Sequence, residues 1–275
     1  MKPGRIDVAC RARSLLFSTV ALFLAVNARA AALMCTFADE QGRVLRSVEV
    51  QLTLIGTELS QHEKSDKKGQ VVFKNLSPGT YGLHAQLKDH VPLSRNVEVA
   101  NDQTFSLTLM TRKGFDHLEL EADHAINTGE FSKAAGILEN LVAAYPLDPV
   151  LHDNLGRAYA GMLDEEKALA EARKAAQLDP RFSGSQMEIE RFILRQQGQK
   201  ALESRDFAKA AGLFERLAKL DPKNAEAYYG MALAYGHQQD YTKALPAIRK
   251  AIELDPQNDA YLKVKGILEA NAHAQ

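Results

Sequence analysis

Histidines and carboxylates are the side chains of this chain that could act as catalysts or metal ligands. The pair closest to a zinc-binding His-x-x-Glu motif is His237 and Asp240, which are separated by two glutamines. The eight histidines are otherwise scattered, and carboxylate pairs such as Glu165 and Glu166 fall where solvated helix surfaces are expected. No Gly-x-Ser-x-Gly elbow, glycine-rich phosphate loop or HExxH helix occurs. We therefore predict that the chain is not an enzyme and has no catalytic residue, metal site or cofactor.

A repeated spacing of prolines indicates which elements carry the polar side chains of the C-terminal part. Pro146 and Pro180 are 34 residues apart, and so are Pro222 and Pro256. The last three follow Leu-Asp, and small residues recur at fixed offsets within each interval. A period of about 34 with this pattern is typical of stacked two-helix repeats, which build binding surfaces.

These residues resemble the tetratricopeptide repeat family over about 145 residues. The resemblance implies an α-α solenoid of four helical hairpins at about 115–148, 149–182, 191–224 and 225–258. A capping helix would follow and complete an array over 113–275. The fourth unit shows the packing positions most fully, with Tyr228, Met231, Ala232, Tyr235, Ala244, Ile248 and Ala251.

The family resemblance also implies which residues line the concave groove, namely set positions on the first helix of each hairpin. By register these positions include Asn154, Arg157, Arg195, Gln199, Tyr229 and His237. Arginines beside Asn and Gln suit a carboxylate or a peptide backbone, and a tyrosine suits an apolar anchor. The N-terminal end of the groove would be acidic, with Asp116, Glu119 and Asp123.

Two features depart from a regular array. The interval from Pro180 to Pro222 is longer than the other two, so about eight extra residues lie near 181–190. We expect 187–190 to lengthen the first helix of the third unit. Residues 259–270 are expected to form the closing helix, with Tyr261, Val264, Ile267 and Leu268 on its apolar face.

The segment before the repeats reads as a small β-sandwich. Residues 48–54, 97–99 and 105–109 alternate apolar and polar side chains, and turn signals containing Gly42, Gly69 and Gly79 separate the runs. The stretch 65–81 resembles the carboxypeptidase regulatory-like domain, a transthyretin-like sandwich, which implies a non-catalytic domain over 31–112. We expect Gly69 and Gly79 to adopt turn conformations closed to other residues, and Tyr81 to anchor a corner through its ring and hydroxyl.

The N-terminus resembles a secretory signal peptide. Basic residues precede an apolar run from Leu15 to Val26, and Ala28-Arg29-Ala30 supplies a cleavage pattern. We therefore predict a signal peptide over 1–30 and an exported protein, periplasmic or extracellular and bacterial in type. One cysteine, Cys35, remains after cleavage, and we expect a free, half-buried thiol in the first strand. Lipid anchoring through Cys35, and retention of 1–30 as a membrane anchor, are the alternatives.

The charge balance limits the partners. The formal net charge is −1, and residues 113–275 hold 20 Lys or Arg against 25 Asp or Glu, so no basic face for nucleic acid is visible. We predict a scaffold or adaptor that binds another envelope or secreted protein through the groove. The alternative is a glycan or cell-wall binding sandwich, with the repeats as a spacer or a self-association surface. A homo-oligomer is the third possibility. The junction at 111–114 is expected to leave some freedom between the two domains.

Overall fold

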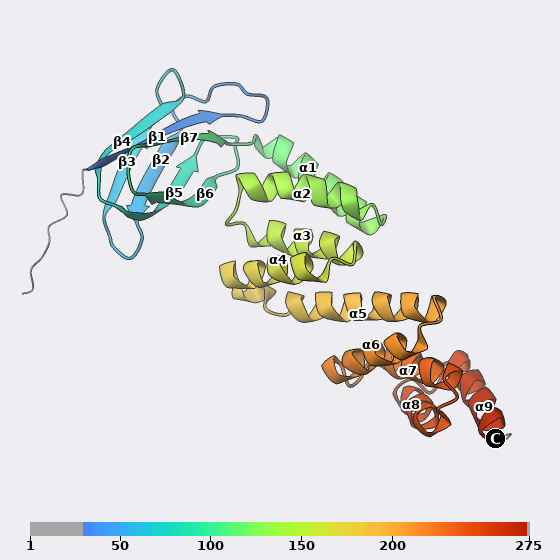
Figure 1. The fold of residues 1–275 in the computed structure, drawn as a ribbon. Helices are drawn as coiled ribbons and strands as arrows, with labels where there is room; N and C mark the ends of the chain where they lie inside the picture. Colours follow the sequence, from blue (N-terminus) through green and yellow to red (C-terminus); the bar gives the residue numbers. More distant parts are fainter. Residues whose placement is uncertain (1–29, 274–275) are drawn as a thin grey trace, which may run out of the picture.

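The computed structural model describes residues 30–273, which form two sheets followed by a stack of helices (Figure 1). The predicted leader, 1–30, lies outside the described residues except for Ala30. The strands are β1 (Ala31–Ala38), β2 (Glu49–Leu54), β3 (Ser60–Lys64), β4 (Gln70–Leu76), β5 (Gly79–Gln86), β6 (Leu93–Val99) and β7 (Gln103–Thr108). The helices are α1 (Arg112–Asn127), α2 (Phe131–Ala144), α3 (Pro149–Gly161), α4 (Glu165–Leu178), α5 (Ser185–Glu203), α6 (Phe207–Leu220), α7 (Ala225–His237), α8 (Tyr241–Leu254) and α9 (Asp259–His273), with a 3₁₀ turn, η1 (Pro180–Phe182).

This order of elements confirms the predicted fold class, a small β-sandwich followed by an α-helical solenoid. The two sheets have the strand orders β4-β1-β7 and β3-β2-β5-β6. The first strand pairs antiparallel with β4 and parallel with β7, so it is the centre of its sheet. Its alternate residues from Ala31 to Phe37 are buried between the sheets, as expected of a strand with one covered face. No helix within 30–273 is long and apolar enough to cross a bilayer.

The structure confirms the predicted roles of Gly69 and Tyr81 at the turns of the sandwich but not that of Gly79. Gly69 has a φ of +73°, and a Cβ on it would lie 2.7 Å from the carbonyl oxygen of Phe37, so the turn requires glycine. Gly79 is not in the left-handed region, and the prediction of a special turn conformation there is wrong. Its lack of a side chain instead leaves room for Leu54, whose Cδ1 would lie 2.8 Å from a Cβ. Tyr81 is buried and donates its hydroxyl to the carbonyl of Ser77 at 2.9 Å, as predicted.

The thiol of Cys35 is fully buried rather than half-buried. It lies in the middle of β1 with Leu33 and Phe37, all three 0% exposed. Burial raises its pKa to about 12, and the charge of Arg95 opposes this rise. A lipid on this sulfur would have to displace the core of the sandwich.

The four helical hairpins, α1–α2, α3–α4, α5–α6 and α7–α8, share one kind of turn. In each turn, the residue two positions before the start of the second helix has a positive φ. Side-chain caps at Asp164, Asp206 and Asp240 each accept a hydrogen bond from the first turn of the second helix. Such a cap stabilises a helix by about 1 kcal/mol. The four equivalent left-handed residues are Gly129 (81°), Leu163 (62°), Arg205 (60°) and Gln239 (61°).

The longer interval between Pro180 and Pro222 is accommodated between the second and third hairpins. The turn η1 follows α4 directly, with Asp179 as its cap and Arg181 in an ion pair with Asp179 at 2.5 Å. The next helix, α5, then begins at Ser185 and is 19 residues long. The prediction that 187–190 extends a first helix is confirmed.

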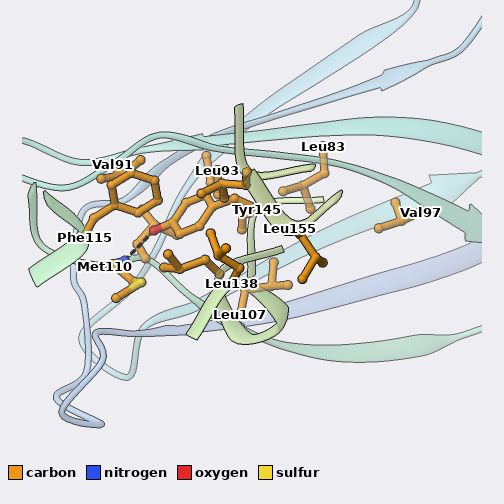
Figure 2. Packing of buried hydrophobic residues seen from close by; sticks show 14 of the residues in the cluster. Leu83, Val91, Leu93, Val97, Leu107, Met110, Phe115, Leu138, Tyr145 and Leu155 are labelled. Carbon is orange, nitrogen blue, oxygen red and sulfur yellow. Dashed lines mark hydrogen bonds between the residues drawn. The ribbon is translucent and has the colours of Figure 1, made fainter. Parts of the chain in front are cut away.

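The sandwich and the first helices share one hydrophobic core (Figure 2). The ring of Tyr145 packs edge-on against Phe115 with centroids 5.2 Å apart, and its hydroxyl accepts a hydrogen bond from the backbone N–H of Met110 at 2.7 Å. Glu40 accepts hydrogen bonds from both the backbone N–H and the hydroxyl of Thr111, at 2.9 and 2.6 Å. Thr111 caps α1 and the helix begins at the next residue, so residues 112–114 of the junction are helical.

A second core begins inside α5. Ile189 and Ile193 belong to the first core, whereas Leu194 and Ala201 pack with α6, α7, α8 and α9 in the second. The closing helix buries Tyr261 and Leu268, as predicted, but Ile267 is 59% exposed. The apolar face of α9 is thus narrower than the sequence suggested.

Candidate binding groove

The first helices of three successive hairpins, α1, α3 and α5, line a pocket of about 620 Å³. Its apolar walls are Ile126, Phe131, Ala160, Phe182, Ile189 and Phe192. Its polar lining is Asn127, Asp153, Arg157, Arg181, Ser185 and Glu188, and Gly184 completes the wall. A concave pocket with aromatic walls and a few polar groups is the usual form of a binding site.

The extra residues between the second and third hairpins build one side of this pocket. Phe182 comes from η1, and Gly184, Ser185 and Glu188 come from the start of the lengthened α5. The hydroxyl of Ser185 donates to the carboxylate of Asp153 and so ties the start of α5 to α3. Without the extra residues the pocket would lose this wall.

A chain of hydrogen bonds places Arg157 in the pocket. The side-chain amide of Asn154 donates to Asp123 on α1 at 3.2 Å, and its oxygen accepts from Arg157 Nη1 at 3.4 Å. Asn154 is only 7% exposed, so it is a support for Arg157 rather than a contact for a partner. Arg157 itself is exposed, and no carboxylate within residues 30–273 is close enough to form an ion pair with it.

Two further predicted groove residues lie beyond this pocket on α5. Arg195 is 3.5 Å from the carboxylate of Glu226, and its guanidinium lies 5.8 Å from the ring centre of Phe192. Gln199 is exposed and donates to Glu203 on its own helix at 3.2 Å. Both side chains are therefore engaged within the array.

The predicted groove residues of α7 are engaged as well. The ring of Tyr229 packs against Tyr261 of α9, with centroids 4.8 Å apart. His237 stacks on Phe207 at 4.4 Å, with the two rings nearly parallel. Of the six predicted residues, Arg157 alone lines the pocket.

Repeat register places Asp153, Arg157 and Phe192 in the groove, but it misses the part of the pocket lining that comes from the extra segment. Phe182, Gly184 and Ser185 lie in the extra segment, where the repeat register assigns no position. The long interval between Pro180 and Pro222 indicates that residues are inserted there. It does not indicate whether the inserted residues face the groove.

Helix α1 contributes Ile126 and Asn127 to the pocket lining and carries carboxylates further towards its N-terminus. Asp116, Glu119 and Asp123 are spaced so that they share one face of the helix. The pKa of Glu119 is raised, first by burial and then by the charges of Asp123, Asp148 and Asp116, while the charge of Arg112 opposes this rise. This N-terminal end of the groove is therefore acidic, in line with the expectation from sequence.

Nothing in the described part of the chain assembles into a metal site, because no three His, Cys, Asp or Glu side chains there come close enough together. The two residues nearest to a zinc motif have structural roles. His237 stacks on Phe207, and Asp240 caps α8 through the backbone N–H of Lys243. The groove can bind, position and exclude water, and its charges can select a partner.

Comparison with known proteins adds to this description of paired helices and a concave pocket. Residues 195–259 match the tetratricopeptide repeat model. This match covers the end of α5 through α8, the two hairpins of the second core.

Two curated relatives match part of the chain. The wheat (Triticum aestivum) Hsp70-Hsp90 organizing protein is 29% identical over 117 residues, which are 42% of this chain and 19% of the relative. Cellulose synthase operon protein C of Escherichia coli K12 is 32% identical over 113 residues, 39% of this chain and 10% of the relative. The alignments thus span between a tenth and a fifth of these relatives.

Among solved structures, MamA from Desulfovibrio magneticus RS-1 is similar at 22% identity, with a TM-score of 0.39 over 57% of this chain and 85% of the other. A tetratricopeptide repeat protein from Parabacteroides merdae has 21% identity and a TM-score of 0.39, covering 58% of this chain and 60% of the other.

Proposed function

We propose that this chain is a non-catalytic scaffold or adaptor that binds a segment of another protein in the groove of its helical array. The observation that carries the proposal is the pocket between α1, α3 and α5, where aromatic walls surround the exposed and unpaired Arg157. An apolar anchor in a desolvated pocket, oriented by a few hydrogen bonds, is how protein segments are commonly held. The name of the wheat relative, which describes a protein that organises Hsp70 and Hsp90, agrees with this role.

The proposed setting is the periplasm or the extracellular space. The basic start, the apolar run and the Ala-Arg-Ala sequence of 1–30 support export, and so does the resemblance of the sandwich to a regulatory-like domain of exported proteins. The partner would then be another envelope or secreted protein, or a second copy of this chain. The acidic balance of the repeats disfavours nucleic acid as a partner.

A blocked-pocket variant tests the groove. Gly184 has helical backbone angles, and a Cβ there meets no atom within 4 Å, so Gly184→Trp can fill the mouth of the pocket without backbone strain. Gly136 on α2 is equally open and lies outside the pocket lining, so Gly136→Trp is the matched control. A displayed library of random peptides of about 12 residues, long enough to cross the pocket, would be selected on the chain 30–275.

We expect selected peptides to bind the parent and Gly136→Trp equally, and to lose most of their affinity for Gly184→Trp. Circular dichroism and thermal unfolding would show that both variants remain folded. Peptides that bind all three proteins equally would move the binding surface away from the groove and overturn the proposal.

The outer face of the four-stranded sheet supports a second candidate function, glycan binding by the sandwich. A hollow of about 560 Å³ lies there, lined by Glu49, Val50, Gln51, His62, Glu63, Lys64, His84 and Gln86. His62 and His84 flank Gln51 in adjacent strands, and such polar side chains can bind sugar hydroxyls. Retention of the whole chain on peptidoglycan or polysaccharide, abolished in the double variant His62→Ala, His84→Ala, would support this candidate. Equal retention of the variant would rule it out.

A further inference from the structure

Three arginines around the groove are neutralised by carboxylates of the chain itself. Arg181 pairs with Asp179 at 2.5 Å, Arg191 with Asp221 at 3.1 Å and Arg195 with Glu226 at 3.5 Å. Within 30–273, Arg157 and Arg112 have no such pair: the guanidinium of Arg157 is held by the neutral Asn154, and Arg112 lies near Glu119 on α1.

The acidic side chains of the same surface are not neutralised. Within 30–273, Asp116, Glu119 and Glu188 form no side-chain hydrogen bond and no ion pair, although the charge of Arg112 partly offsets the rise in the pKa of Glu119. Asp123 and Asp153 accept hydrogen bonds, but from the uncharged Asn154 and Ser185. Along α1, α3 and the start of α5, five carboxylates thus outnumber two arginines, Arg112 and Arg157, that have no ion-pair partner within 30–273.

These carboxylates are continuous with the apolar pocket. Asp153 and Glu188 line it directly, and Asp123 is linked to its Arg157 through Asn154. Glu119 is close enough to Asp123 for the two charges to repel, which contributes to its raised pKa. The repulsion would be relieved by a cation brought by a partner.

We propose that the occupant of the groove is a protein segment with a large apolar side chain beside one or more lysines or arginines. The apolar side chain fills the pocket between Phe131, Phe182 and Phe192, and the basic side chains lie along the carboxylates of α1. This inference rests on the proposed function, since it names the chemistry of the partner at the same groove.

Arg157 does not conflict with a basic partner. Its guanidinium has donors and no acceptor, and a peptide backbone offers carbonyl oxygens at every residue. Arg157 can therefore bind main-chain carbonyls of the segment, while the carboxylates on either side select its side chains. Association should accordingly be faster and tighter at low salt.

Two triple variants with the same net charge distinguish the effect of the groove carboxylates on binding from the effect of the overall charge. Asp116→Asn, Glu119→Gln and Asp123→Asn remove three carboxylates from the groove. Glu58→Gln, Glu63→Gln and Glu98→Gln remove three from the sandwich, where none of them has an ion-pair partner among the described residues. Both triple variants change the net charge by the same amount, and neither replaces a residue of the pocket lining.

The probes are the peptides selected on the parent chain, measured by fluorescence anisotropy at about 0.05 M and about 0.5 M salt. We expect them to be enriched in Lys or Arg near a Phe, Leu, Ile or Met and depleted in Asp and Glu. The groove triple variant should bind them about tenfold more weakly at low salt, with little loss at high salt, and the sandwich triple variant should match the parent.

The failure of this inference differs from the failure of the proposed function. Peptides that are acidic or uncharged, yet lost on Gly184→Trp, would overturn the basic partner and leave groove binding in place. Basic peptides weakened equally by both triple variants would also overturn it, because only the overall charge would then matter. Peptides that bind Gly184→Trp as tightly as the parent would overturn both the basic partner and groove binding.

Discussion

His152 is a buried side chain whose two ring nitrogens both face acceptors. Its Nδ1 lies 2.6 Å from Glu171 Oε2, and its Nε2 lies 2.9 Å from the carbonyl oxygen of Pro146. Only the protonated imidazole donates from both nitrogens. Burial lowers the pKa of His152, but the hydrogen bonds to Glu171 and Pro146 raise it by more, so the net pKa lies above its usual value.

This raised pKa predicts how stability depends on pH. The protonated ring contributes stability that is complete below the unfolded-state pKa of about 6.5 and is lost as pH rises through the higher folded-state pKa. We expect the free energy of unfolding to fall as pH rises from about 6.5 through the higher folded-state pKa of His152, and His152→Gln to remove that part of the fall. Urea unfolding of parent and variant over this range measures it. Parallel curves for the two proteins would show that His152 is not responsible.

At the scale of elements, the ring of Phe214 on α6 packs against a glycine on each of two neighbouring helices. A Cβ on Gly198 of α5 would lie 2.8 Å from this ring, and a Cβ on Gly230 of α7 would lie 2.6 Å from it. Phe214 is 4% exposed, so it cannot move into solvent without opening the second core. Close approach of α5, α6 and α7 thus depends on these two glycines.

Alanine at two glycines should consequently have opposite effects. Gly230→Ala forces the new methyl group against a buried ring and should destabilise the protein by about 1–3 kcal/mol. Gly212 lies in α6 with open space at its Cβ, so Gly212→Ala should stabilise by about 0.5–1 kcal/mol through helix propensity. Chemical denaturation of both variants gives the comparison. If both substitutions shifted stability in the same direction, the packing of Phe214 would not be the deciding contact.

At the scale of the whole molecule, the structure divides its core inside α5 and not where the sandwich meets the helices. The first core runs from β1 to Ile193, and the second from Leu194 to Leu268. Near this division, Arg216 of α6 forms ion pairs with Glu165 of α4 and Glu190 of α5, at 3.4 and 3.6 Å. Partly exposed pairs of this kind contribute at most about 1 kcal/mol each. We therefore expect the two cores to unfold as separate units.

Tyr145→Phe tests this division. The substitution leaves the buried N–H of Met110 without its acceptor, which should cost about 1–3 kcal/mol. Amide hydrogen exchange should then quicken in β6, β7 and α1 to α3 together, while α6 to α8 keep their protection. Faster exchange confined to the sandwich, or spread over the whole chain, would contradict the proposed pair of cooperative units.

Local patterns made much of this architecture predictable. The alternation of apolar and polar residues in 48–54 indicates a strand with one buried face, and the spacing of the prolines indicates helical hairpins. Both patterns arise from contacts with elements that are close in the sequence. Tyr81 was assigned correctly because its partner, Ser77, is only four residues away. The partner of Tyr145 is 35 residues away in another kind of structure, and no periodicity marks such a contact.

The candidate groove was harder to predict for a related reason. Register identified the helix faces, yet the pairing of Tyr229 with Tyr261 depends on how α9 folds back. Burial of Asn154 depends on Asp123 from the previous hairpin. The pocket wall at Phe182 arises from residues outside the repeat, where backbone direction is set by tertiary packing.

The parallel pairing of β1 with β7 has a consequence for the order in which the chain can fold. β1 leaves the ribosome, or an export channel, about 70 residues ahead of the strand that completes its sheet. Until that strand and then Tyr145 emerge, β1 is an apolar segment with one edge unpaired, open to misassociation. The helical hairpins, built from contacts close in sequence, have no such delay. A holding chaperone, where one acts on this chain, would therefore be needed for the nascent sandwich and not for the repeats.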